Sequence, residues 1–137
     1  MKKTILFVVL LFIGATMQAQ KISYKGSGIG KIESDGEVYV KGSRVGEFKS
    51  NGDVRYKGST IGKIESDGDV YYKGSRIGEI ESDGDVRYKG STIGKIESDG
   101  DVYYKGSRIG ECDDVPQQWA AGFFFFFFWD LDSGKAK

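Results

Sequence analysis

Histidine is absent from the 137 residues, and cysteine and proline occur once each, as Cys112 and Pro116. Without histidine the chain lacks the commonest general base and metal ligand. With a single cysteine it cannot build an internal disulfide framework. These absences argue against most hydrolytic and metal-dependent enzymes. We expect a protein that is not an enzyme, with no catalytic residue, no metal and no cofactor.

Long apolar segments are also scarce. The uninterrupted run at 5–13 is well short of the roughly 20 residues that a membrane-spanning helix needs. Lys2 and Lys3 precede this run and Ala19 follows it, which is the layout of a secretory signal peptide over residues 1–19. The short run disfavours the alternative, a membrane anchor. We therefore expect export across the inner membrane to the periplasm, the outer membrane or the outside of the cell.

Charge of one sign is lacking as well, because 20 basic residues balance 20 acidic ones. Loss of residues 1–19 removes two lysines and leaves a net charge of −2. The two signs alternate along the chain, so no basic patch marks a nucleic-acid surface. No nucleic-acid partner is expected.

What the chain does have is a repeat of 16 residues over 20–112, approximately KGSxIGxIESDGDVxY. Valines and glycines recur at this spacing: Val38, Val54, Val70, Val86 and Val102, and Gly30, Gly46, Gly62, Gly78, Gly94 and Gly110. Each unit has two short runs of strand-forming residues, separated by Ser-Asp-Gly on one side and Lys-Gly-Ser on the other. This pattern predicts serial β-hairpins.

The Ser-Asp-Gly turn has two candidate geometries, a two-residue turn and a three-residue loop. A three-residue loop places Gly30, Ile32, Val38 and Val40 on one apolar face. The two-residue register would mix charged residues into that face, so we predict the three-residue loop. The register at the Lys-Gly-Ser turn is left unassigned, because Ile61 and its equivalents fall out of phase with the other apolar positions.

The predicted register brings together cross-strand pairs that change in step. Where the first residue is Glu the second is Arg, and where the first is Lys the second is Tyr, and both kinds of pair are favourable. The pairs are Lys31 with Tyr39, Glu47 with Arg55, Lys63 with Tyr71, Glu79 with Arg87, and Lys95 with Tyr103.

The ends of the array predict closure of the hairpins into a ring. Residues 21–25 are an isolated second strand of a unit, and residues 108–112 are an isolated first strand. Pairing them would leave no exposed sheet edge. Five Ser-Asp-Gly-type turns but six Lys-Gly-Ser turns occur, so the ring is five-fold or six-fold. Cys112 occupies a core isoleucine position and is interpreted as a small buried side chain.

After the array, residues 113–131 predict a short apolar helix, from about Val115 to Trp129. Asp114 and Gln117 have capping-box spacing around Pro116. The run Phe123 to Phe128 is apolar around its whole circumference and must be buried. It would pack on or plug the ring, which we favour, or contact a membrane surface or another copy. The residues available for such a contact are Trp119, Phe123, Phe124, Phe125, Phe126, Phe127, Phe128 and Trp129. Residues 132–137 form a polar tail.

Two function classes follow from these features. The first is a structural or interaction module of the cell envelope. The second is a lectin-like binder of glycans at repeated outward positions, although these positions also suit cross-strand packing: Tyr39, Arg55, Tyr71, Arg87 and Tyr103. The recurrent acidic turns have too few ligands for a calcium loop, and turn chemistry accounts for them.

The repeated YKGSxIGxIESDGDV and the phenylalanine-rich tail resemble the five-fold β-flower proteins, which are secreted bacterial proteins. The resemblance covers about 21–131. It implies a ring of β-hairpins about an axis, in a family without an assigned activity.

Overall fold

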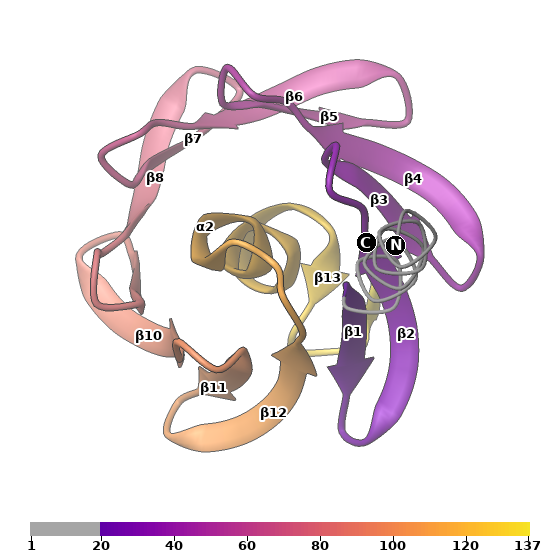
Figure 1. Cartoon of the computed structure of the whole chain (residues 1–137). Helices are drawn as coiled ribbons and strands as arrows, with labels where there is room; N and C mark the ends of the chain where they lie inside the picture. Colours follow the sequence, from indigo (N-terminus) through magenta and orange to yellow (C-terminus); the bar gives the residue numbers. More distant parts are fainter. Residues whose placement is uncertain (1–19) are drawn as a thin grey trace, which may run out of the picture.

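The computed structural model describes residues 20–137 and shows a closed ring of twelve antiparallel strands around a central helical segment (Figure 1). The predicted all-β ring of hairpin repeats with a short C-terminal helix is thereby confirmed. The predicted signal peptide lies outside the described residues. The ring strands are β1 Lys21–Tyr24, β2 Ser27–Ile32, β3 Glu37–Val40, β4 Ser43–Phe48, β5 Asp53–Tyr56, β6 Ser59–Ile64, β7 Asp69–Tyr72, β8 Ser75–Ile80, β9 Asp85–Tyr88, β10 Ser91–Ile96, β11 Asp101–Tyr104 and β12 Ser107–Cys112.

The Ser-Asp-Gly connections are three-residue loops, as predicted. In the first of them the Glu33 N–H donates to the Glu37 carbonyl at 2.8 Å. Gly36 has a φ of +97°, a conformation that glycine adopts without steric cost. The strands pair in the predicted register, so Ile32 and Val38 lie opposite each other and are buried.

The Lys-Gly connections, whose register the sequence left open, are tight two-residue turns. Lys73 and Gly74 both have positive φ, +48° and +87°, which is the signature of a type I′ turn. The same pair of conformations occurs at all six Lys-Gly positions. Type I′ turns match the twist of the flanking strands, so each hairpin closes without splaying.

A β-bulge in every hairpin explains the out-of-phase isoleucines. The register between β7 and β8 skips Ile77, which lies between the paired residues Arg76 and Gly78. The carbonyl of Ile77 accepts a hydrogen bond of 2.9 Å from the N–H of Lys89 in the next hairpin. The equivalent bond recurs at all six tight turns, at 2.7–3.0 Å. The bulges therefore link each hairpin to its neighbour.

The ring closes where we predicted, between β1 and β12. Ile22 pairs with Cys112 and Tyr24 with Gly110. The ring thus contains six hairpins joined by five three-residue loops. The sixth loop is missing because the chain enters the ring at residue 20 and leaves it at residue 113.

Cys112 is 1% exposed, which confirms its interpretation as a core side chain. Burial also raises the pKa of its thiol, so the reactive thiolate is disfavoured. We expect iodoacetamide to leave Cys112 unmodified in the native protein and to alkylate it fully in denaturant. Mass spectrometry measures the modification. Rapid alkylation of the native protein would show that the Cys112 side chain is not buried.

The helical segment passes through the ring from the loop end to the tight-turn end. It consists of an α-helix, α2 Gln117–Ala121, and a π-helix, η1 Gly122–Phe127. Gln117 at its start contacts the end of β10, and Trp129 after it contacts Tyr24 near a tight turn. All six phenylalanines are at most 8% exposed. This segment, residues 117–128, is here called the plug, and it forms the core of the ring.

The predicted helix start is wrong. The helix begins at Gln117 rather than Val115, and no side chain caps it. Asp114 has a φ of +53° and lies outside the helix, which prevents the predicted capping box. Gln117 instead donates from Nε2 to the carbonyl of Ile96 at 2.9 Å.

Replacing Gln117 by alanine would remove this link between the plug and β10. A partly buried carbonyl would lose its partner, so we expect a loss of roughly 0.5–1.5 kcal/mol in the free energy of unfolding. Gln118→Ala is the matched control and should change stability by less. Urea unfolding followed by tryptophan fluorescence measures both, and equal losses would contradict the role of Gln117.

Consecutive phenylalanines meet consecutive hairpins. Each phenyl group lies over the glycine of one strand, and a Cβ added to that glycine would come within 2.5–3.2 Å of the phenyl carbons. The pairs are Phe124 on Gly110, Phe125 on Gly94, Phe126 on Gly78, Phe127 on Gly62 and Phe128 on Gly46. One step along the plug thus equals one 16-residue step backwards along the array. In a π-helix each hydrogen bond spans five residues instead of four, so the helix rotates by less than the roughly 100° per residue of an α-helix. Each residue of the plug therefore turns by an angle closer to the one between neighbouring hairpins.

The last residues fold back on the plug. Strand β13 Trp129–Asp130 pairs with β14 Lys135–Ala136. The Tyr56 hydroxyl donates to the Lys137 carbonyl at 2.6 Å. The segment expected to be a polar tail therefore covers part of one end of the ring.

Candidate functional site

The predicted ligand surface is spread around the outside of the ring. Tyr39, Arg55, Tyr71, Arg87 and Tyr103 occupy one equivalent position on five different strands. Three of them, Arg55, Tyr71 and Arg87, line separate grooves of about 450, 330 and 320 Å³. The ring therefore does not bring these residues together in one site.

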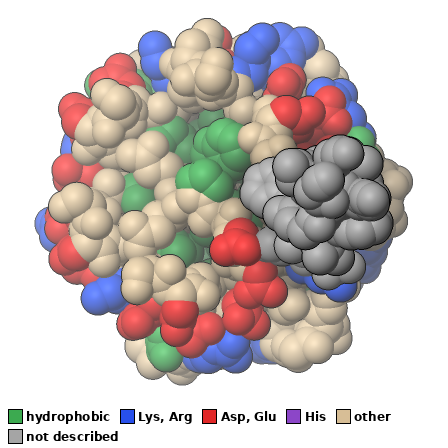
Figure 2. Space-filling model, viewed as in Figure 1, with side chains coloured by type: hydrophobic (Ala, Val, Ile, Leu, Met, Phe, Trp, Pro, Cys, Tyr) green, Lys and Arg blue, Asp and Glu red, His purple; other side chains and the backbone are tan. Residues whose placement is uncertain are grey.

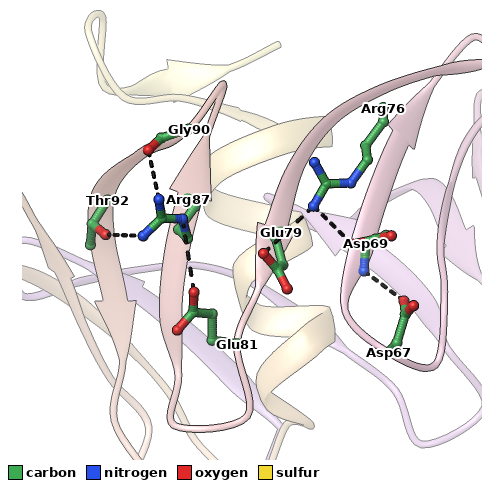
Figure 3. A network of polar contacts seen from close by, with 8 residues as sticks. All are labelled: Asp67, Asp69, Arg76, Glu79, Glu81, Arg87, Gly90 and Thr92. Atoms are coloured by element: carbon green, nitrogen blue, oxygen red, sulfur yellow. Dashed lines mark hydrogen bonds and ion pairs between the residues drawn. The ribbon is translucent and has the colours of Figure 1, made fainter.

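Three of these outer side chains, Tyr39, Arg55 and Arg87, already have partners within the chain. Arg87 donates to the Gly90 carbonyl at 2.7 Å and to the Thr92 hydroxyl at 3.3 Å (Figure 3). Lys31 lies 5.1 Å from the centre of the Tyr39 ring. Partial burial, followed by the hydrogen bond to Glu37, raises the pKa of the Tyr39 hydroxyl. These contacts fit the packing role that the sequence offered as the alternative to sugar binding.

The predicted cross-strand pair of Glu79 and Arg87 has the right register but makes no ion pair. Glu79 instead lies 3.5 Å from Arg76, and Arg76 also binds Asp69 at 3.0 Å (Figure 3). The hydrogen bond and charge of Asp69 raise the pKa of Arg76. Arginine follows three of the six Lys-Gly-Ser turns, as Arg44, Arg76 and Arg108, and each of these arginines pairs with acidic residues of its own hairpin. The unassigned register of this turn concealed that role.

The acidic loops gather carboxylates close together. Glu65, Asp67 and Asp69 bring one oxygen each within 4.8 Å of one another. Asp67 Oδ1 accepts a hydrogen bond from the Asp69 N–H at 3.1 Å, which confirms its role as a turn residue. Asp69 is held by Arg76. Both acidic side chains are accounted for by contacts within the chain.

The residues considered for a membrane or assembly contact lie almost entirely inside the ring. Phe123 to Phe128 and Trp129 are buried, and Trp119 is partly exposed, stacked on Phe48 at 5.7 Å. Among residues 20–137 no helix has the length and hydrophobicity to cross a bilayer. Seen along the axis, charged side chains of both signs rim the ring and hydrophobic ones lie near its centre (Figure 2).

A second set of tyrosines, which the sequence reading did not select, surrounds the tight-turn end of the ring, here called the tight-turn mouth. Each precedes a Lys-Gly turn and meets one phenylalanine of the plug at 5.9–6.5 Å between ring centres: Tyr24, Tyr56, Tyr72, Tyr88 and Tyr104. The sixth equivalent position is Val40. Each tyrosine lies two positions after a core valine or, for Tyr24, after the core residue Ile22, and this alternation could have shown that they face inward.

The returning tail covers only part of the tight-turn mouth. Trp129 packs on Tyr24 at 5.2 Å, and Lys137 binds Tyr56. The tyrosines of three neighbouring hairpins, Tyr72, Tyr88 and Tyr104, remain beside an open cleft. Tyr72 and Tyr88 are each 39% exposed, and they are the exposed large hydrophobic residues in the described part of the chain. The tail thus breaks the symmetry that the repeats create.

This mouth cleft has a volume of about 560 Å³. It is lined by side chains from three hairpins, the plug and the tail: Tyr72, Ile77, Tyr88, Ile93, Tyr104, Lys105, Phe125, Phe126, Trp129, Asp130, Leu131, Asp132 and Lys137. Its size falls within the roughly 300–1,000 Å³ of small-molecule sites. The cleft is the strongest candidate binding site on the molecule.

Comparison with known protein families identifies the family of the chain. A sequence model of the 5-fold beta-flower proteins matches residues 17–128, which include both the hairpin array and the phenylalanine plug. No curated protein and no solved structure matches the chain. The five-fold description corresponds in number to the five three-residue loops, whereas the tight turns and hairpins number six. The chain belongs to the 5-fold beta-flower family.

Proposed function

We propose that this protein is a secreted, non-enzymatic interaction module of the cell envelope, and that it binds its partner at the tight-turn mouth. The observation that carries the proposal is the uncovered half of that mouth, where Tyr72 and Tyr88 are exposed beside a cleft. Exposed aromatic side chains beside a concave surface are typical of binding sites. The signal-peptide pattern of residues 1–19 supports secretion.

Two features support a role without catalysis. The chain has no histidine, and its single cysteine, Cys112, is buried away from the cleft. The phenylalanine plug fills the ring, so the scaffold is a packed core rather than a channel. A rigid ring with a fixed aromatic surface is suited to recognition.

Cosedimentation with an envelope fraction tests this proposal. We expect the purified protein to sediment with envelopes of the bacterium that encodes it, and the Tyr72→Ser/Tyr88→Ser variant to remain in the supernatant. Tyr71→Ser/Tyr103→Ser, on the outer surface, is the matched control and should sediment like the unchanged protein. Sedimentation that is absent, or unaffected by loss of Tyr72 and Tyr88, would contradict the proposal.

A further inference from the structure

The chemistry of the mouth cleft indicates what kind of ligand it takes. Its apolar surface comes from Phe125 and Phe126 of the plug and from the aliphatic side chains of two β-bulges, Ile77 and Ile93. The tyrosines add aromatic rings with hydroxyl groups, which combine an apolar body with a polar end. A ligand that fits must therefore present both apolar and hydrogen-bonding surface.

The charges that line the cleft cancel. Lys105 and Lys137 contribute two positive charges, and Asp130 and Asp132 two negative ones. An anionic or a cationic ligand would gain no net attraction from this set and would lose hydration on binding. Lys137 Nζ already donates to the Phe126 carbonyl at 3.1 Å, and Asp130 Oδ1 accepts from the Asp132 N–H at 3.0 Å. The balance favours an uncharged ligand, with Asp132 as an acceptor and Lys105 as a donor.

One residue that lines the cleft carries a buried donor without a hydrogen-bond partner. Trp129 lines the cleft and is 3% exposed, and its Nε1 is the one buried side-chain nitrogen or oxygen in residues 20–137 without a hydrogen bond. An unsatisfied buried donor costs about 1–3 kcal/mol. Nε1 is closed off from the surface, so a ligand would reach this N–H only with a shift of the Trp129 side chain, and an oxygen atom placed there would then recover that cost.

From these observations we infer that the mouth cleft binds a neutral saccharide. Sugars carry an apolar C–H face and a rim of hydroxyl groups, which match the tyrosine rings and the alternating donors and acceptors of the cleft. The volume of about 560 Å³ accommodates a short oligosaccharide. This inference rests on the proposed function, because it names the ligand class of the same site.

The test uses Trp129 as its reporter. The chain has two tryptophans, and in Trp119→Phe excitation at a wavelength that tyrosine does not absorb reports on Trp129 alone. Cellotriose, N,N′,N″-triacetylchitotriose and maltotriose are titrated separately to about 10 mM, which detects dissociation constants in the millimolar range. Decanoate, an anionic amphiphile, is titrated in parallel to represent the competing ligand class.

We expect at least one of the three sugars to shift the Trp129 emission. In the same background Tyr88→Ala should weaken binding about tenfold or more, because Tyr88 is a wall of the cleft. Tyr103→Ala, which removes a tyrosine from the outer surface, should leave binding unchanged. Tyr88 is partly exposed, so its loss should spare the fold, and circular dichroism checks this.

No response to any of the three sugars, or equal binding by Tyr88→Ala, would overturn the saccharide inference. A response to decanoate alone would also overturn it. If the sugars fail while envelope sedimentation still depends on Tyr72 and Tyr88, the ligand class is wrong and the proposed function stands. If the sugars bind and sedimentation fails, the envelope role is wrong and the saccharide site stands.

Discussion

Removal of residues 115–137 is expected to abolish the cooperative fold. Each buried phenylalanine contributes about 1.5–3 kcal/mol, so the six in the plug contribute on the order of 10 kcal/mol. A whole domain is stable by only roughly 5–15 kcal/mol. The truncated ring would also expose the inward side chains of its strands to water, and thermal unfolding should show no sigmoidal transition.

The matched control is a shorter truncation that removes residues 134–137. It deletes β14 and the hydrogen bond to Tyr56 but leaves all six phenylalanines in place. We expect it to unfold cooperatively at a slightly lower temperature. If the longer truncation keeps the Tm and circular dichroism spectrum of the full chain, the plug is not the core.

A methyl group placed between the ring and the plug is expected to lower the free energy of unfolding more than any other single substitution proposed for this protein. In Gly78→Ala the new Cβ would lie 2.8 Å from Cε1 of Phe126 and in collision with the carbonyl oxygen of Arg87. A carbonyl in a strand pair cannot move without disturbing the sheet. We expect a loss of about 1–3 kcal/mol or more in the free energy of unfolding, measured in urea.

Gly28→Ala is the matched control for this substitution. Gly28 also lies in a strand, has no positive φ, and has open space where the Cβ would be. Its replacement should leave stability unchanged or raise it slightly. The double variant Gly78→Ala/Phe126→Leu should lose less stability than the sum of its single variants, because the smaller side chain relieves part of the collision. Equal losses for Gly78 and Gly28 would contradict the packing.

Much of the ring could be predicted because side chains alternate between the two faces of the sheet wherever no bulge interrupts a strand. Shifting the register by one residue would turn Lys31 and Glu33 toward the core, so the apolar positions Ile32 and Val38 select one loop length. Closure followed from the same logic, because residues 21–25 and 108–112 are complementary halves of one repeat unit.

The tight-turn register was harder to predict for two physical reasons. Lys73 adopts a left-handed backbone conformation that residues other than Gly, Asn and Asp rarely take, so a lysine at this position does not predict a type I′ turn. Ile77 sits in a bulge, where the two-residue period breaks. Alternation alone therefore could not assign the following strand.

The mouth cleft could not be predicted from the repeats because the tail creates it. Tyr56 and Tyr72 occupy equivalent positions, yet the tail binds the first and leaves the second exposed. Which tyrosines are covered depends on where the chain leaves the plug after Phe128. That exit depends in turn on the π-helical rotation of the plug, which a uniform run of phenylalanines does not encode in any pattern.

The central claim is that each phenylalanine from Phe124 to Phe128 contacts one glycine of one hairpin, in reverse chain order. Solution NMR with labelled phenylalanine and glycine tests it most directly, through nuclear Overhauser contacts between phenylalanine ring protons and glycine Hα protons. The structure predicts a ladder of five contacts, from Phe124 with Gly110 to Phe128 with Gly46, with Phe126 on Gly78 at its centre. A different order, or no contact between these residues, would contradict the account.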